Sequence, residues 1–245
     1  MVSLSVNVNK VATLRNARGG DVPSVLAAVR VCVVQGVAGI TVHHRSDERH
    51  IRRGDVLEIA ELLRSEAPDV ELNIEGDPRP EWLELVTRVR PTQATLVPVR
   101  PGEITSEAGW SRDTDLGFMR AVVAQLQAAG ARVSIFIDPA LEPVEWAKQA
   151  GADRIELYTE PYAKAFARGA AAGRESFARY AAVAQQAHAG GLGINAGHDL
   201  DLDNLALFRT LPHLAEVSIG HALISRALFV GLDRVVREYL DCLKG

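Results

Sequence analysis

Residues 39–51 read GITVHHRSDERHI, a short apolar strand that passes directly into a run of histidines and arginines. Strands that are apolar along their whole length are typical of parallel sheets, which are covered on both faces. Polar groups directly after such a strand lie at its carboxyl end, where α/β proteins bind ligands. Two arginines among three imidazoles favour an anionic ligand, such as a phosphate, beside a titratable acid or base. A solvated basic loop is the alternative interpretation.

This strand is one of eight short β-type segments that recur evenly along the chain. The eight are residues 4–8, 39–43, 70–75, 94–97, 132–138, 154–158, 193–196 and 216–220. Segments of helical periodicity separate them, for example residues 23–35, 55–64, 81–89, 116–129, 144–150 and 175–189. Eight β/α units in 245 residues match a closed (β/α)8 (TIM) barrel, which we predict as a single domain over residues 1–245. An open doubly wound sheet is the alternative, although no GxGxxG turn follows the first strand.

Composition excludes several classes of function. The chain has 27 Lys and Arg against 31 Asp and Glu, a net charge of −4, and no basic tail, so we expect no nucleic-acid or membrane partner. Cys32 and Cys242 are far apart, which argues against a disulfide framework or structural zinc and suits a reducing cytoplasm. No apolar run reaches membrane-spanning length. No spacing indicates a metal site, although a three-histidine site stays open.

Alternation along the predicted strands places polar side chains inside the barrel. In the first strand, Leu4 and Val6 share one face, and Ser5 and Asn7 share the other. If the apolar set packs on the helices, the interior holds Asn7, Asn9, Thr41, His43, Asn73, Glu75 and Glu156. Barrel interiors are normally filled with branched apolar residues, and buried polar groups cost free energy unless they are paired or serve a ligand. A salt-bridge network would explain one or two of these residues but not seven.

Four groups of reactive or charged residues converge on the carboxyl end of the barrel. Arg15 and Arg18 follow the first strand within residues 7–20, where a basic helix start is the alternative interpretation. The segment 39–51 is the second group. Glu75 and Glu156 end two other strands, where burial would raise their pKa values toward acid/base duty. Either carboxylate is equally well interpreted as a salt-bridge partner of an arginine.

The fourth group follows the last two strands. INAGHD (194–199) and SIGHA (218–222) each contain a glycine that lets backbone N–H groups approach a ligand. Residues 222–229 are predicted to form a short helix whose N-terminus points at the site, which is the recurrent phosphate site of this barrel. His198 and His221 stand beside it. Together with His43, they put imidazoles on three strand ends, which a structural role explains poorly.

The motifs VATLRNARG, GITVHxRxDxRHI, LNxE, SxFID, IExxT, NAGH and IGHAxIxRALFxGL resemble those of the pyridoxine 5′-phosphate synthase family. The match runs in register from the first strand to the C-terminal helix. The resemblance implies a (β/α)8 barrel that assembles as a homo-oligomer, commonly an octamer, and needs no metal or organic cofactor. It also implies two phosphorylated small-molecule substrates, 1-deoxy-D-xylulose 5-phosphate and 3-amino-2-oxopropyl phosphate. Their condensation closes a pyridine ring with loss of phosphate and water.

The resemblance also implies residue roles. His43 would be a general acid/base, Glu75 a second base and His198 a proton donor, and Glu156 would stabilise a charged intermediate. The pentulose phosphate would be held by Arg45, His50 and Thr105, beside positions 9 and 10. The aminoketone phosphate would be held by Asn7, Arg18, Gly220, His221 and the residue after His198, which is Asp199.

The chain departs from the family pattern mainly at expected substrate contacts. Asn9 and Lys10 stand where the family has Asp-His, Val99 replaces a glutamate, Tyr158 and Glu160 replace His and Gly, Asp199 replaces Gly, and Ser218 replaces Asn. The four expected catalytic residues are spared. We therefore weigh three hypotheses: a vitamin B6 synthase, which we favour, a paralogue that makes a different heterocycle, and a non-catalytic barrel that binds phosphorylated metabolites.

Overall fold

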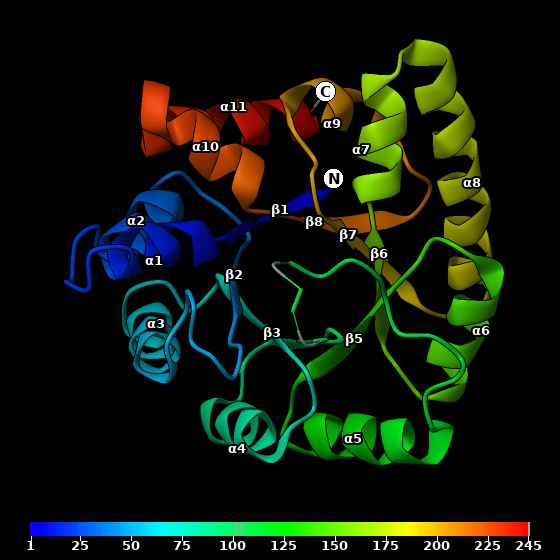
Figure 1. The fold of residues 1–245 in the computed structure, drawn as a ribbon, viewed down its shortest axis with the longest axis horizontal. Coiled ribbons are helices and arrows are strands. Elements are labelled where there is room, and N and C mark those ends of the chain that lie inside the picture. The colour runs from blue at the N-terminus through cyan, green and yellow to red at the C-terminus, as the bar shows by residue number, and fades with distance from the viewer. Residues whose placement is uncertain (101, 104, 245) are drawn as a thin grey trace.

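A computed structural model, which describes residues 1–100, 102–103 and 105–244, contains a closed barrel of parallel strands (Figure 1). The strands are β1 (Ser3–Asn7), β2 (Gly39–His43), β3 (Glu71–Gly76), β4 (Gln93–Leu96), β5 (Arg132–Ile137), β6 (Arg154–Tyr158), β7 (Gly193–Gly197) and β8 (Leu214–Ile219). Each strand pairs with the next in the chain, and β8 closes the barrel against β1. The predicted TIM barrel is confirmed.

Helices surround the barrel, as Figure 1 shows. They are α1 (Asn9–Asn16), α2 (Val25–Val34), α3 (Arg53–Glu66), α4 (Pro80–Val89), α5 (Leu116–Ala128), α6 (Leu141–Gln149), α7 (Glu160–Ala167), α8 (Ala170–Ala189), α9 (Leu202–Phe208), α10 (His221–Val230) and α11 (Leu232–Lys244). The short helices α1, α7 and α9 were not predicted, because seven or eight residues show too little periodicity. None of the described helices is long and apolar enough to span a bilayer.

The barrel interior is polar, as the alternation of side chains predicts. Ser5 Oγ lies 2.6 Å from Thr41 Oγ1, and Thr95 Oγ1 donates to Asn73 Oδ1 at 2.9 Å. Buried polar side chains on the strands include Ser5, Thr41, Asn73, Gln93, Thr95, Ser134, Asn195 and Glu216. One expected member is placed differently. The first strand ends at residue 7, so Asn9 reaches the interior from the first turn of α1 and not from the strand.

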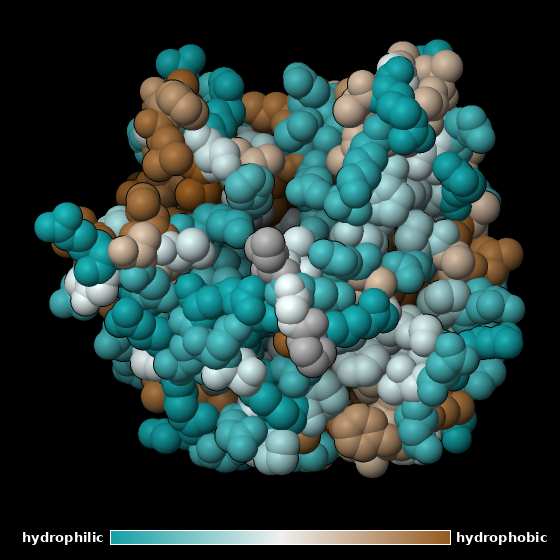
Figure 2. All heavy atoms as spheres, in the orientation of Figure 1, coloured by the Kyte–Doolittle hydropathy of each residue, from teal (hydrophilic) through white to brown (hydrophobic). Residues whose placement is uncertain are grey.

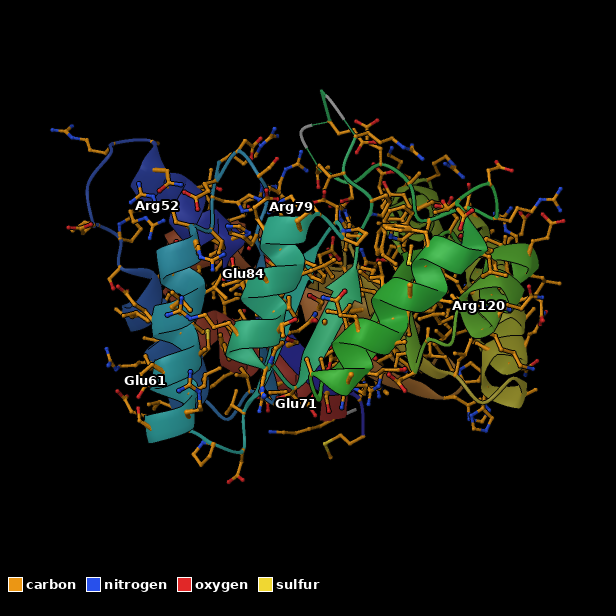
Figure 3. All side chains as sticks on the ribbon, turned by 90° about the horizontal axis from the view of Figure 1, so that it is seen from below. Arg52, Glu61, Glu71, Arg79, Glu84 and Arg120 are labelled. Atoms are coloured by element: carbon orange, nitrogen blue, oxygen red, sulfur yellow. The ribbon has the colours of Figure 1, made fainter. Side chains whose placement is uncertain are left out.

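Ion pairs close the amino end of the barrel. Arg132 pairs with Glu71 at the start of β3, and Arg154 Nη1 lies 4.0 Å from Glu216 Oε2. Figure 3 views the barrel from the side, with Glu71 at the lower end and Arg79, which follows β3, at the upper end. Each of these charges has a partner on another strand of the barrel, and the side chains of Arg132 and Glu71 remain partly exposed.

Arg15 has a structural role, because it connects α1 to α3 and to the loop after β2. Its Nη1 and Nη2 atoms lie 2.5 and 2.8 Å from the two carboxylate oxygens of Asp55, and Nη2 also donates to His50 O at 3.3 Å. Asn16 Nδ2 donates to the same carbonyl at 2.7 Å. These bonds tie α1 to α3 and to the loop after β2. Arg15 is therefore committed to structural contacts and does not line the pocket. The segment does contain a helix, but Arg15 lies in its last turn and Arg18 beyond it, so the alternative of a basic helix start is also wrong.

Gly76 lies at the end of β3 because a larger residue would collide with Trp82. A Cβ atom at position 76 would lie 2.2 Å from Trp82 Nε1, and that indole is fully buried and donates to Glu75 O at 3.0 Å. We expect Gly76→Ala to lower the free energy of unfolding by about 1–3 kcal/mol through overpacking, measured by urea denaturation. Gly54→Ala is the matched control, because nothing lies within 4 Å of that site. A parent-like midpoint for Gly76→Ala would contradict this packing.

Candidate active site

A pocket of about 290 Å³ opens at the carboxyl end of the barrel. Figure 2 shows this face, where hydrophilic residues predominate around the barrel axis. Of the predicted site residues, the pocket is lined by Asn7, Asn9, Lys10, His43, Arg45, His50, Glu75, Thr105, Glu156, His198, Asp199, Gly220 and His221. Arg18 is the exception. It is exposed beyond the end of α1 and does not line the pocket, so the described structure gives no support to its predicted phosphate contact.

His43 and Glu75 face each other from neighbouring strands. His43 Nδ1 lies 3.8 Å from Glu75 Oε2, which also accepts a hydrogen bond from Asn7 Nδ2 at 3.4 Å. The backbone N–H of His43 donates to Asn9 Oδ1 at 2.9 Å, which explains how α1 helps to fix the end of β2. The other ring nitrogen, His43 Nε2, is buried and has no hydrogen-bond partner among the described residues. It is the atom free to contact a molecule in the pocket.

Burial shifts both groups toward their neutral forms. It raises the pKa of Glu75 to about 8, with a further contribution from the charge of Glu216. Burial also lowers the pKa of His43 well below its usual value, and the nearby charges of His50 and Arg45 add to this effect. Near neutral pH the pair is thus a neutral imidazole beside a mostly protonated carboxyl group. Such a pair can both accept and release a proton during a reaction.

Glu156 is a second buried carboxyl group on the pocket wall. It is 3% exposed, and its Oε2 has no hydrogen-bond partner within the described part of the chain. A Cβ atom at Gly197 would lie 2.4 Å from its Oε1, so glycine at that position leaves the carboxyl group its space. Burial, then the charges of Glu75 and Glu216, raise the pKa of Glu156. A carboxyl group in this environment is best satisfied by a positively charged ligand atom.

The loop after β2 supplies a site for an anion. Arg45 is 4% exposed, and its Nε has no hydrogen-bond partner among the residues that the structure describes. His50 Nδ1 accepts from the backbone N–H of Ile51 at 2.9 Å, so the proton of the neutral ring lies on Nε2. Burial lowers the pKa of His50 to about 4, and the positive charges of Arg45 and Lys10 add to this shift. Arginine, lysine and an imidazole N–H together suit a phosphate group.

The N-terminus of α10 supplies a second site for an anion. Gly220, His221 and Ala222 line the pocket, and no side chain caps the first turn of this ten-residue helix. Free backbone N–H groups and the helix dipole favour a phosphate there. A Cβ atom at Gly220 would lie 3.0 Å from Asn7 Cβ, so glycine also lets the end of β8 approach β1. The prediction of a helix after β8 is confirmed.

Seven of the residues that line the pocket were not among the predicted site residues, and three of these seven are polar or aromatic. Ser106, Phe136 and Ser218 all line the cavity, although Ser218 was noted as a departure from the family. Phe136 was detectable, because it shares the inward face of β5 with Ser134. Ser106 belongs to the long segment between β4 and α5, for which periodicity gives no signal.

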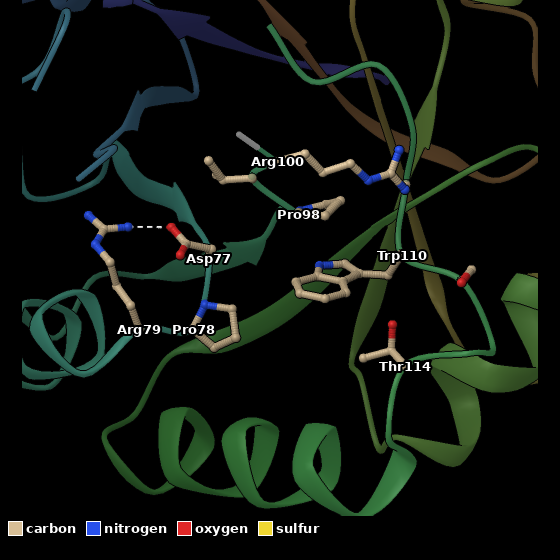
Figure 4. Close-up of a pocket in the computed structure, with 10 residues that line it drawn as sticks. Asp77, Pro78, Arg79, Pro98, Arg100, Trp110 and Thr114 are labelled. Carbon is tan, nitrogen blue, oxygen red and sulfur yellow. Dashed lines mark hydrogen bonds and ion pairs between the residues drawn. The ribbon is translucent and has the colours of Figure 1, made fainter. Parts of the chain in front are cut away.

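A separate hollow of about 400 Å³ lies beside the ends of β3 and β4. Figure 4 shows it, with the Trp110 ring near Pro98 and with Arg79 turned toward Asp77. Arg79 Nη2 also contacts His44 Nδ1 at 2.8 Å and donates to His44 O at 2.9 Å. These bonds hold His44 outside the catalytic pocket, as expected from the opposite orientation of His43 and His44 on the strand.

Known proteins resemble this chain over its whole length. It matches the family described as "Pyridoxal phosphate biosynthesis protein PdxJ" over residues 4–245. It is 51% identical over 245 residues to the pyridoxine 5′-phosphate synthase of Bacteroides fragilis, covering 100% of both chains. The same identity holds over 244 residues for the synthase of Porphyromonas gingivalis, covering 99% of both chains.

Solved structures with the same fold are much more distant in sequence. KGPDC from Streptococcus mutans superposes with a TM-score of 0.63 at 12% identity, covering 100% of this chain and 98% of that chain. A 3-hexulose-6-phosphate synthase superposes with a TM-score of 0.62 at 13% identity, covering 99% and 100%. These likenesses confirm the fold alone.

The raised pKa of Glu75 predicts a pH-dependent stability. The native state keeps this proton to about pH 8, whereas an unfolded chain releases it near its ordinary value, so native stability falls as pH rises through this window. Glu75→Gln does not titrate. Its free energy of unfolding relative to the parent should therefore rise between pH 5 and 8, by up to about 1.4 kcal/mol per pH unit. Urea denaturation at several pH values measures this, with the exposed Glu175→Gln as control. Parallel curves for parent and Glu75→Gln would refute it.

Proposed function

This chain belongs to the PdxJ family of pyridoxal phosphate biosynthesis proteins, and on that premise we propose how its pocket performs the condensation. The enzyme is a ring-closing synthase of vitamin B6 biosynthesis. The proposed reaction joins 1-deoxy-D-xylulose 5-phosphate to 3-amino-2-oxopropyl phosphate and yields pyridoxine 5′-phosphate, phosphate and water. The observation that carries the proposal is the single pocket in which two anion sites flank a buried acid/base pair.

The two anion sites correspond to the two phosphate groups. Arg45 and His50, with Lys10 and Thr105, would hold the pentulose phosphate. The N-terminus of α10, which lines the same pocket, would hold the aminoketone phosphate. Bound in this way, the amine of one substrate and the carbonyl of the other would lie in one cavity. Holding two reactants in this way replaces a bimolecular encounter by an intramolecular step.

Proton transfer is the second requirement of the reaction. His43 lines the pocket, and its Nε2, which has no partner among the described residues, would take or give the protons of imine formation and dehydration. Glu75, 3.8 Å from the other ring nitrogen, would exchange a proton with it. Glu156 would ionise beside a cationic intermediate, and His198 would protonate a leaving oxygen.

A second candidate function is a paralogue with an altered substrate. Its support is that Lys10 and Asp199, two departures from the family pattern, both line the pocket. A carboxylate near a phosphate is unfavourable, and more so where water is partly excluded. This candidate keeps the same acid/base residues and changes only the amine or carbonyl compound. A non-catalytic phosphate-binding barrel is a weaker reading, because it gives no role to the unpartnered buried nitrogen of His43.

We also propose a cytoplasmic homo-oligomer, with an octamer as the expected assembly. Leu228 and Phe229 on α10 are 68% and 88% exposed, and an apolar area covers this helix in Figure 2. Burying such side chains against another copy would remove them from water. Both cysteines are free, which is compatible with a reducing compartment. Light scattering of the purified protein measures the assembly, and a monomer would contradict this part of the proposal.

Incubation with the two named substrates tests the reaction directly. We expect pyridoxine 5′-phosphate and one equivalent of inorganic phosphate, both detected by chromatography. His43→Asn should reduce kcat by at least about 10²-fold, because it removes the acid/base group. His188→Asn, at the C-terminal end of α8, is the control and should keep parent activity. Full activity of His43→Asn would disprove the role given to His43.

The same assay separates the two catalytic candidates. If the parent is inactive and the combined variant Asn9→Asp, Lys10→His, Asp199→Gly gains activity, the paralogue is supported and the synthase reaction is refuted. An active parent supports the synthase.

Arg45 gives a test of the anion site. Arg45→Met keeps the volume of the side chain but removes its charge-assisted hydrogen bonds. Such bonds contribute about 1.5–3 kcal/mol, so KM for the pentulose phosphate should rise about 10- to 100-fold. KM for the aminoketone phosphate should change little. Equal increases for both substrates would argue against two separate phosphate sites.

A further inference from the structure

The backbone around His198 has an unusual conformation, which is stabilised by Thr159, the residue directly after the neighbouring strand β6. His198 and Asp199 have φ values of 86° and 57°, in the left-handed region that residues other than glycine seldom adopt. Thr159 at the end of β6 stabilises this turn. Its backbone N–H donates to Gly197 O at 3.0 Å, and its hydroxyl contacts both Gly197 O, at 2.6 Å, and His198 O. The position of His198 therefore depends on residues at the β6–α7 junction.

The imidazole ring of His198 is also enclosed by side chains. The Tyr158 ring meets it edge-on, with centroids 5.2 Å apart and an angle of 81° between planes. Phe136 lies on another side, with centroids 5.8 Å apart. On the pocket side, Thr105 Oγ1 lies 3.5 Å from His198 Nε2. The two aromatic walls thus leave Nε2 facing the pocket.

Tyr158 is itself fixed by a chain of polar contacts. Its hydroxyl donates to Glu160 Oε2 at 2.8 Å, and Glu160 Oε1 lies 2.8 Å from Lys164 Nζ. Tyr158 is buried. Glu160 lies in the first turn of α7, where the helix dipole stabilises a negative charge. Positions 158 and 160 are two of the positions at which the sequence departs from the family pattern, where His and Gly are expected.

We propose that Tyr158 and Glu160 are positioning residues for His198. Tyr158 holds the imidazole with Nε2 toward the pocket, and Glu160 fixes Tyr158 and places a negative charge near the ring. The inference rests on the proposed role of His198 as proton donor. It adds two residues that touch no substrate and act through His198.

The charges that face His198 fit this role. Burial lowers the pKa of His198, and the positive charge of Lys10 adds to that effect, whereas the negative charges of Asp199 and Glu160 oppose it. A proton donor has to carry its proton before the reaction, and the two carboxylates reduce the extent to which burial disfavours that form. Lys10, Asp199 and Glu160 all depart from the family pattern, and their charges offset one another at this ring. Lys164 screens part of the Glu160 charge.

Two variants separate the effects of charge and of contact. Glu160→Gln keeps an oxygen that can accept from Tyr158 but removes the charge. Tyr158→Phe keeps the ring but removes the bond to Glu160. The readouts are the NMR titration of His198 in the ligand-free protein, assigned by its loss in His198→Asn, and the pH profile of kcat. Glu175→Gln, exposed on α8, is the control variant.

We expect Glu160→Gln to lower the pKa of His198 and to move the pH dependence of kcat in the same direction. Tyr158→Phe should lower kcat by about 10- to 100-fold, with KM within about twofold, because a displaced donor costs rate and not binding. A His198 titration and a kcat that match the parent in both variants would overturn the inference. Because the titration needs no substrate, an inactive parent that shows the Glu160→Gln shift would refute the proposed reaction while supporting this placement of Glu160.

Discussion

A closed barrel that encloses several carboxyl groups has to keep each of them either paired or protonated. Glu75, Glu156 and Glu216 are all buried, and a buried carboxylate is costly unless it is paired or protonated. Glu216 lies 4.0 Å from Arg154 and accepts hydrogen bonds from Gln93 and Asn195. Of the two that line the pocket, Glu75 accepts a hydrogen bond of 3.4 Å from Asn7, and Glu156 Oε2 accepts none among the described residues. Burial raises the pKa of both. Carboxyl groups are therefore paired with arginines at the amino end of the barrel, whereas those that line the pocket at the carboxyl end favour their neutral form.

Several arginines lie near the pocket but do not neutralise its carboxyl groups, because two of them are paired with other residues. Arg15 is committed to Asp55 and Arg79 to Asp77 and His44, so both stabilise loops. Arg45 has weaker contacts: its Nε lies 3.8 Å from Asp47 Oδ1 without a hydrogen bond, and its Nη2 donates to Glu103 O at 3.4 Å. The sequence shows all three as arginines after strands, but only their partners distinguish a structural cation from one that binds a ligand.

Most of the fold and most of the site could be predicted from the sequence, and the failures have physical causes. Strand positions followed from β-rich segments, and the inward orientation of His43 and Glu75 followed from the alternation of side chains. Arg18 and Asn9 were placed less well, because α1 begins immediately after β1 and turns the chain through helical periodicity, which the strand alternation cannot describe. The enclosure of His198 by Tyr158 was also out of reach, since it depends on contact between two strands. Glu216 was detectable by alternation but was overlooked.

The double anchoring of the loop after β2 has a consequence for the order of events. Arg15 and Asn16 hold its far end through His50 O, while His44 N bonds to Glu75 O at its start. Arg45 and His50 are therefore arranged before any substrate arrives, so little conformational entropy is lost when a phosphate binds between them. Under the proposed function, a preformed site of this kind would favour binding of the pentulose phosphate first, and the amine would then meet a carbonyl that is already immobile.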